Sequence, residues 1–265
     1  QTIRASGKKL AINYFLIMIP IFIGFVLPIL ILFFNMIESI TIQSLKSSIL
    51  VSGNTFFVAG LGSVLIMIAA TILGTLNYML KNKNITLLTN LSAMGYAFPG
   101  TMLAIGVIIF VGQMDSFLKN LFSSVFDVSR PIYLSGTLAV LLFAYLVRYL
   151  AVGYGSIVSG LQNIPINLNY ASRTLGSSME HTIRRITMPL LIKFVFAGSI
   201  LVFVDIVKEL PMTLLLRPFN FETLATYTYQ FAHDELMAQA SMPALIIILV
   251  SIIPIIFLNR LLVKS

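Results

Sequence analysis

Three charged residues near the end of an apolar segment are the first candidates for chemistry. Asp205 lies inside the segment, and Lys208 and Glu209 follow three and four residues later, which places all three on one face of a helix. An acid inside an apolar segment is costly unless it is paired or hydrated, so Asp205 is a functional candidate. Two interpretations stay open: a local ion pair between Asp205 and Lys208, or three residues that line and gate the outer part of a path across a membrane.

A second group of candidate ligands follows, with the hard oxygen and imidazole donors that ferric iron accepts. The group consists of Tyr227, Tyr229, His233, Asp234 and Glu235. Tyrosines are also common at membrane boundaries, and acids in a loop are usually solvated, so we assign no metal site here. His181, within a basic stretch, is interpreted as a surface residue.

Motifs for several kinds of enzyme are missing from the sequence. It contains no G-x-x-x-x-G-K-[ST] phosphate loop, no H-E-x-x-H zinc motif and no G-x-S-x-G nucleophile motif. Gly155 and Ser156 alone do not make a serine protease, because no histidine lies in an apolar segment to activate the hydroxyl. The absence of cysteine excludes disulfides and thiolate metal sites. We therefore expect neither catalysis nor a cofactor in this chain.

The composition indicates that these residues are positioned by helices in a lipid bilayer. Hydrophobic side chains make up 58% of the chain and charged ones 10%, with a mean hydropathy of +0.98, which is too apolar for a soluble globule. Crossing the bilayer takes about 20 helical residues, and every backbone polar group there must be bonded within its own segment. Six runs fit, near 10–34, 56–80, 91–112, 132–151, 189–207 and 242–262. The predicted fold is all-α, a single transmembrane domain over 1–265 with a long loop over 152–188.

Basic residues set the expected orientation. If the N-terminus is cytoplasmic, 12 basic residues lie in cytoplasmic segments and 5 in outer ones, as the positive-inside rule requires. The 12 are Arg4, Lys8, Lys9, Lys81, Lys83, Arg148, Arg173, Arg184, Arg185, Lys193, Arg260 and Lys264, and the 5 are Lys46, Lys119, Arg130, Lys208 and Arg217. Acids are biased the other way, with Glu38, Asp115, Asp127, Glu209, Glu222, Asp234 and Glu235 outside and Glu180 inside. Both termini are expected in the cytoplasm, and the net charge of +8 reflects topology, not affinity for nucleic acid.

A polar, basic stretch between Tyr170 and Pro189 interrupts the apolar runs and predicts two short helices. Pro165 fits the first turn of one helix, and the small side chains of Ala171 and Ser172 would let another surface approach it closely. Gly176 would end that helix in a left-handed turn, which glycine adopts without a Cβ penalty. Ser177 and Glu180 have the spacing of a capping box, which would open a second helix. That helix is expected to run to about Ile186, with Arg184 and Arg185 near its end.

This stretch resembles the EAA loop of the permease subunits of bacterial binding-protein-dependent ABC importers. In that family the pattern is E-A-A, three residues, Gly, nine residues, then I-x-L-P. Ala171, Gly176, Ile186 and Pro189 match the pattern, Ser172 stands at the second alanine, Met188 at the leucine and Tyr170 at the glutamate. The resemblance implies a coupling helix that docks on a cytoplasmic ATPase. The alternative is an ordinary interfacial helical hairpin.

Three further stretches resemble the ferric-iron branch of these permeases. They are G-Y-A-F-P-G-T from Gly95, A-Y-L-V-R ending at Arg148, and K-E-L-P-M-T-L-L-L-R-P-F from Lys208. Members of this branch are commonly twice as long, with two homologous halves, so the resemblance favours a C-terminal half, with a separate homodimerising subunit as the alternative. Pro99, between Gly95 and Gly100, would either loosen its span beside a cavity or simply kink a packing helix.

The resemblance implies a six-span subunit of a type I ABC importer in the bacterial inner membrane, fed by a binding protein that docks on its outer surface. Its other partners would be a second permease half or copy and an ATPase dimer, which would bind ATP and Mg²⁺. Ferric iron is the expected cargo, with thiamine, a phosphonate or a polyamine as alternatives. The competing class is half of a secondary transporter or channel, which predicts ionisable residues in the middle of several spans, where this sequence offers only Asp205.

Overall fold

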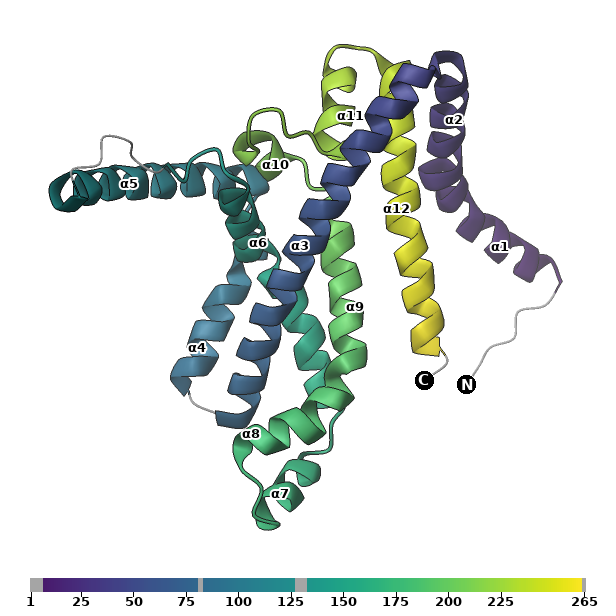
Figure 1. Cartoon of the computed structure of the whole chain (residues 1–265). Helices are drawn as coiled ribbons and strands as arrows, with labels where there is room; N and C mark the ends of the chain where they lie inside the picture. Colours follow the sequence, from purple (N-terminus) through teal and green to yellow (C-terminus); the bar gives the residue numbers. More distant parts are fainter. Residues whose placement is uncertain (1–6, 81–82, 127–132, 264–265) are drawn as a thin grey trace.

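The computed structural model describes residues 7–80, 83–126 and 133–263, and its regular elements in those ranges are all helices (Figure 1). Arg4, Lys81, Asp127, Arg130 and Lys264, which entered the orientation argument, lie outside the described residues. Within the described ranges, six helical stretches are long and apolar enough to cross a membrane: Leu10–Ser39, Ile42–Leu80, Gly100–Leu121, Leu138–Gln162, Met179–Val207 and Met237–Arg260. The all-α prediction is confirmed.

The described helices follow one another along the chain in this order. The first span consists of α1 (Lys8–Ile21), the π-turn η1 (Phe22–Val26) and α2 (Leu27–Ser39), and it is followed by α3 (Ile42–Leu80), α4 (Lys83–Ser92), the 3₁₀ turn η2 (Ala93–Ala97), α5 (Gly100–Phe126) and α6 (Leu138–Gln162). The second half consists of α7 (Ile166–Thr174), α8 (Met179–Thr182), the π-turn η3 (Ile183–Thr187), α9 (Met188–Val207), α10 (Pro211–Leu216), α11 (Leu224–His233) and α12 (Met237–Val263).

Helices α3, α6 and α9 pack together and form the core of the molecule (Figure 1). Ile66, Leu141, Ile157, Val202 and Val207 from these helices are fully buried where they meet. Figure 1 shows α7 and α8 at one end of this core, while α10 and α11 lie toward the opposite end. The described end of α12 points toward the α7–α8 end, and α12 packs against α2.

The fourth span is longer than the hydropathy of the sequence predicted. The expected loop over 152–188 is wrong in its first part, because α6 continues to Gln162. Glycines and serines lower the hydropathy there, but the same glycines allow close helix contacts. A Cβ on Gly153 would lie 3.1 Å from Met67 Sδ of α3, and a Cβ on Gly160 would lie 2.6 Å from the Phe194 ring of α9. The residues that weaken the sequence signal therefore hold α6 against its neighbours.

The predicted third span over 91–112 is also wrong at its start, because the helix breaks before Pro99. Phe98 has φ −83° and ψ 140°, the extended conformation that a residue before proline prefers. The new helix, α5, begins at Gly100 and extends sideways from the bundle, while α4 runs beside α3 (Figure 1). The helix is interrupted at Pro99, and the cavity expected beside it stays a prediction.

Close packing of the turn before this break explains Gly95. An added Cβ would lie 2.0 Å from the Val147 carbonyl oxygen of α6, a contact that only a backbone shift could relieve. We expect Gly95→Ala to lower the free energy of unfolding by about 1–3 kcal/mol, measured by thermal unfolding in detergent. Gly106→Ala is the matched control, because a Cβ there meets nothing within 4 Å. Equal stability of the two variants would contradict the predicted close contact.

The two π-turns in the described chain each end two residues before a proline. Turn η1 ends at Val26, before Pro28, and η3 ends at Thr187, before Pro189. A proline inside a helix lacks the N–H for the usual bond to the carbonyl four residues earlier, and its ring crowds that carbonyl. The wider π-turn relieves this conflict without ending the helix. The chain is consequently helical without a break from Met179 to Val207.

Candidate functional site

The polar stretch folds into a helical elbow, formed by α7, the turn at Gly176 and α8. Gly176 has φ +83°, the left-handed conformation expected from the sequence. Its N–H donates to the Arg173 carbonyl, and the Ser177 N–H donates to the Ser172 carbonyl, at 3.0 and 3.1 Å. These two bonds form a Schellman motif, which satisfies the last carbonyl groups of α7. Pro165 is the N-cap of α7, one residue before the first turn in which it was expected.

The cap of the second helix differs from the prediction. Ser178, not Ser177, is the N-cap, and its hydroxyl accepts a bond from the His181 N–H at 3.2 Å. Glu180 does not reach back to the cap. Its carboxylate lies 3.4 Å from Arg184 in an exposed ion pair. The Schellman motif uses the N–H of Ser177, so the chain needs one more residue before a new helix can start.

Ser178 and Ser177 therefore offer a matched pair of substitutions. We expect Ser178→Ala to destabilise the elbow by about 1 kcal/mol, because the first turn of α8 loses its side-chain cap. Ser177→Ala should have little effect, because Ser177 stabilises the turn through its backbone N–H, which alanine also has. Limited proteolysis of the elbow in the purified protein measures the difference. Faster cleavage of Ser177→Ala than of Ser178→Ala would contradict the observed cap.

Hydrogen bonds between buried polar groups join the elbow to the transmembrane helices. The hydroxyl groups of Ser172 and Thr182 lie 2.9 Å apart and join α7 to α8. The side chain of Asn169 accepts from Thr187 at 3.3 Å and donates to the Tyr78 hydroxyl of α3 at 3.1 Å. Ser172 was expected on a surface open to another molecule, but it is buried against α8. The elbow is consequently held as one unit with α3 and α9.

The outer face of the elbow presents apolar groups to solvent. Tyr170 is 55% exposed, and Ala171 beside it is also exposed. Leu175, at the tip, is 86% exposed. The sequence interpretation missed Leu175, although an apolar residue directly before the helix-ending glycine was a usable signal. These three residues form the surface of the elbow that is open to a partner.

The connection from the elbow to the fifth span is continuous. The expected end of the second helix near Ile186 is wrong, because Ile183–Thr187 is a π-turn that leads directly into α9. Ile186 is half-buried, and Pro189 lies in the first turn of α9. A displacement of α8 is therefore carried into α9 without an intervening loop.

Of the charged residues at the other end of α9, Asp205 and Lys208 pair with each other, and Glu209 pairs with Arg148 of α6. Asp205 lies 2.8 Å from Lys208, which is the local ion pair that the sequence allowed. Glu209 does not share their face, because α9 ends at Val207 and the chain turns inward. Only 6% of the Glu209 side chain is exposed.

Glu209 makes several contacts inside the bundle. Its carboxylate accepts from the Tyr149 hydroxyl at 2.5 Å and from the Met212 N–H at 3.0 Å, which caps the start of α10. Arg148 Nε lies 3.9 Å from the same carboxylate. Charge counting predicted Arg148 at the cytoplasmic end of its span and Glu209 outside, and the placement of Arg148 at the end of its span is wrong. Arg148 lies inside the 25-residue α6, beside Glu209.

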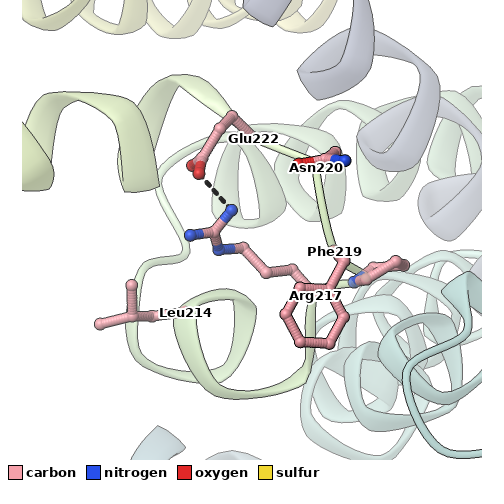
Figure 2. Close-up of a pocket in the computed structure, with 6 residues that line it drawn as sticks. Leu214, Arg217, Phe219, Asn220 and Glu222 are labelled. Atoms are coloured by element: carbon pink, nitrogen blue, oxygen red, sulfur yellow. Dashed lines mark hydrogen bonds and ion pairs between the residues drawn. The ribbon is translucent and has the colours of Figure 1, made fainter.

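A loop between α10 and α11 presents the most exposed aromatic side chain among the described residues, Phe219, at 99% exposure. Arg217 extends across this loop to form an ion pair with Glu222 and donates to the Phe221 carbonyl (Figure 2). Asn220 turns the chain with φ +59°. A pocket at the end of the molecule opposite the elbow is lined by Leu214 of α10 and by residues of this loop, Arg217, Pro218, Phe219, Asn220 and Glu222 (Figures 1 and 2).

The candidate iron ligands do not converge. His233 and Asp234 lie 3.6 Å apart, and each is 68% exposed. Tyr227 packs its ring against Phe231, and Tyr229 packs against His233. Among the described residues, no group of three or more histidine, cysteine or acidic residues could hold a metal ion.

Comparison with known proteins identifies the family. The family described as the binding-protein-dependent transport system inner membrane component matches residues 86–265, which include the broken helix, the elbow and the charged end of α9. The chain belongs to this family. It is therefore a multi-pass inner-membrane permease subunit, and the competing class of secondary transporters or channels is set aside.

The permease is similar to two curated relatives that differ in cargo. It is 23% identical over 263 residues to the Fe(3+)-transport system permease protein FbpB 2 of Haemophilus influenzae, an alignment that covers 98% of this chain and 48% of the relative. It is 27% identical over 122 residues to the putative 2-aminoethylphosphonate transport system permease protein PhnV of Salmonella typhimurium, covering 46% of this chain and 45% of the relative. The chain spans about half the length of the curated relatives it matches.

Solved structures of ABC importers share the fold of the permease. A chain of the bacterial alginate ABC transporter, in complex with an alginate pentasaccharide-bound periplasmic protein, superposes with a TM-score of 0.73 and 14% identity, covering 95% of this chain and 93% of that one. A chain of the MetNI methionine ABC transporter gives a TM-score of 0.61 and 13% identity, covering 84% and 97%. At these identities the likeness establishes the fold alone, and it confirms the predicted importer-permease fold.

Proposed function

We propose that the permease forms half of the membrane pathway of an ATP-driven importer, and that its elbow receives motion from a separate ATPase. The observation that carries this proposal is the construction of the elbow. It turns at Gly176 with a fixed left-handed conformation, is tied to α3 through Asn169, and continues without a loop into α9. Because the elbow is rigid and attached to α3 and α9, a displacement of the elbow would move both helices. Rocking of the two permease halves would then open the pathway to one side of the membrane at a time.

The proposed partners follow from the same arrangement. The face of the elbow with Tyr170, Ala171 and Leu175 would dock on a dimer of ATPase subunits, which would bind ATP and Mg²⁺ because this chain has no phosphate loop. A second permease half, fused or separate, would complete the pathway. A binding protein would dock at the opposite end, near α10 and α11. Both termini would then lie in the cytoplasm.

Ferric iron is the cargo that we propose first. The support is the 98% coverage of this chain in the alignment with the Haemophilus influenzae relative, whose name states Fe(3+) transport. The shorter match to the putative phosphonate permease supports a phosphonate as the alternative. The lining of the pathway would include the break at Pro99 and the pair of Asp205 and Lys208 at the end of α9. Glu209, which the sequence placed with them, is buried and would instead support the packing of the bundle.

Cysteine crosslinking tests the proposed function directly. The sequence contains no cysteine, so Leu175→Cys introduces a single thiol at the exposed tip of the elbow. We expect it to crosslink to the ATPase subunit in the assembled complex, and the yield should change with ATP. The matched control is Phe219→Cys, which is even more exposed and lies at the opposite end of the molecule, so its thiol should not reach the ATPase. Crosslinking of both thiols to the ATPase, or of neither, would contradict the proposal.

Asp205 provides a test of the pathway. We expect Asp205→Ala to reduce uptake several-fold by removing the charge at the outer end of α9, while assembly and ATP hydrolysis remain measurable. The rate of uptake into proteoliposomes and the rate of ATP hydrolysis are measured on the same preparation. Glu38→Ala is the control, because this acid is exposed near the end of α2, outside α9 and outside the proposed docking surface at α10 and α11. Unchanged uptake would leave Asp205 with the local ion pair as its only role.

A further inference from the structure

Arg148 occupies a position that the orientation argument did not foresee and that the proposed function has not used. It lies ten residues after the start of α6, and only 19% of its side chain is exposed. An arginine is effectively always charged, so its five N–H donors need acceptors wherever it is withdrawn from water. The described residues supply few of them. The Nη1 group donates to the Phe98 carbonyl at 3.4 Å, and the buried Nε has no hydrogen-bond partner in the part of the chain described.

The acids near Arg148 are already engaged with other groups. Both oxygens of Glu209 accept bonds, one from the Tyr149 hydroxyl and one from the Met212 N–H. Arg148 Nε is 3.9 Å from the Glu209 carboxylate, which is outside hydrogen-bond range. Asp205 is paired with Lys208. Arg148 therefore keeps N–H donors that no carboxylate among the described residues accepts at hydrogen-bond distance.

The break in the third membrane segment places the guanidinium beside an open surface. A Cβ on Gly100 would lie 2.5 Å from Arg148 Nη1, so the absence of a side chain there leaves room for the guanidinium. Tyr96 and Phe98, on the turn and extended residue before Gly100, are each 50% exposed. The Arg148 guanidinium thus lies next to surface residues at the point where the chain leaves η2 and enters α5.

We propose that Arg148 contacts an oxyanion of the cargo, and that the permease carries an anionic cargo. This inference rests on the proposed importer function and deepens it. A guanidinium matches the two oxygens of a carboxylate or a phosphonate, and in a site shielded from water such a pair is stronger than at the surface. A bare Fe³⁺ ion, thiamine and a polyamine carry no oxyanion that could accept from these donors. Ferric iron as a carboxylate chelate, or a phosphonate, fits the site.

The competing explanation is that Arg148 only neutralises the buried Glu209. The two explanations differ in what happens when both charges are removed. If neutralisation is the only role, Arg148→Gln should impair the protein and the double variant Arg148→Gln/Glu209→Gln should recover. If Arg148 binds the cargo, the double variant regains stability but not uptake, because the oxyanion still lacks its partner.

Uptake by the complete importer, reconstituted with its ATPase and binding protein, tests the inference. The probes are ferric citrate, 2-aminoethylphosphonate, thiamine and spermidine, each supplied alone. We expect ATP-dependent uptake of one of the two anionic probes, reduced about tenfold or more by Arg148→Gln and also by the double variant. Arg148→Lys, which keeps the charge but loses the planar fork, should retain more uptake than Arg148→Gln. The control is Arg260→Gln, because this arginine is exposed near the end of α12.

Each outcome separates the inference from the proposed function. Uptake of thiamine or spermidine only, uptake unaffected by Arg148→Gln, or recovery of uptake in the double variant would overturn the inference while leaving the importer intact. A wild-type complex that takes up none of the four probes with ATP would overturn the inference, while crosslinking of Leu175→Cys to the ATPase decides the proposed function separately. If Arg148→Gln does not assemble, the uptake of Arg148→Lys is compared with the uptake of the double variant. Higher uptake by Arg148→Lys supports the inference, and equal uptake overturns it.

Discussion

Replacing Gly176 with valine is expected to uncouple the permease from its ATPase. The residue has φ +83°, a conformation that costs a β-branched side chain roughly 1–3 kcal/mol or more. Although a Cβ at this position meets nothing within 4 Å, the strain is in the backbone itself. The Schellman bonds would break to relieve it, and the exposed face of α7 would lose its orientation relative to α8. Loss of ATPase co-purification and of ATP-dependent uptake measures the effect.

The control for this substitution changes the side chain but keeps the turn. Asparagine tolerates the left-handed conformation better than other residues with a Cβ, so Gly176→Asn should retain most of the assembly and uptake. If the bulk of the side chain and not the backbone decided the outcome, both variants would fail alike. Normal uptake by Gly176→Val would count against the elbow as the coupling element.

Replacing Glu209 with alanine is expected to have the largest effect on stability. The carboxylate is buried, and its removal leaves Arg148 without a compensating charge and the Tyr149 hydroxyl without its acceptor. It also removes the side-chain acceptor of the Met212 N–H at the start of α10. Breaking one partner of a buried ion pair typically costs about 3–5 kcal/mol. Thermal unfolding of the purified permease in detergent should show a clearly lower Tm.

An exposed glutamate supplies the comparison for Glu209. Glu38 is exposed near the end of α2, so Glu38→Ala should leave the Tm nearly unchanged. The double variant Arg148→Gln/Glu209→Gln should lower the Tm less than Glu209→Ala alone, because neither charge is then left unpaired. Equal Tm values for Glu209→Ala and Glu38→Ala would show that the buried cluster does not stabilise the bundle.

Local backbone chemistry was predictable where a single residue type decides it. Glycine was the only good candidate for the left-handed turn at 176. At Pro99 the sequence allowed a loosened span or a simple kink, and the predicted span ran through it. The cap of α8 was harder, because Ser177 and Ser178 are both good caps and the sequence does not show which N–H the Schellman motif uses. Hydropathy ended the fourth span at Ala151, too early by 11 residues compared with the observed end at Gln162. It failed there because glycines that bury helix contacts contribute little apolar character.

The sequence by itself determined the class of the protein, the number of candidate spans and the position of the elbow. Those features depend on composition, run length and local turn chemistry, which neighbouring residues specify. Only the tertiary structure decided that Arg148 meets Glu209, that Ser172 is buried and that α5 leaves the bundle at Gly100. Each of these depends on contacts between segments dozens of residues apart, such as α6 with the end of α9, and on how closely glycines let helices approach. Charge counting along the chain placed Arg148 and Glu209 on opposite sides of the membrane, and packing places them side by side.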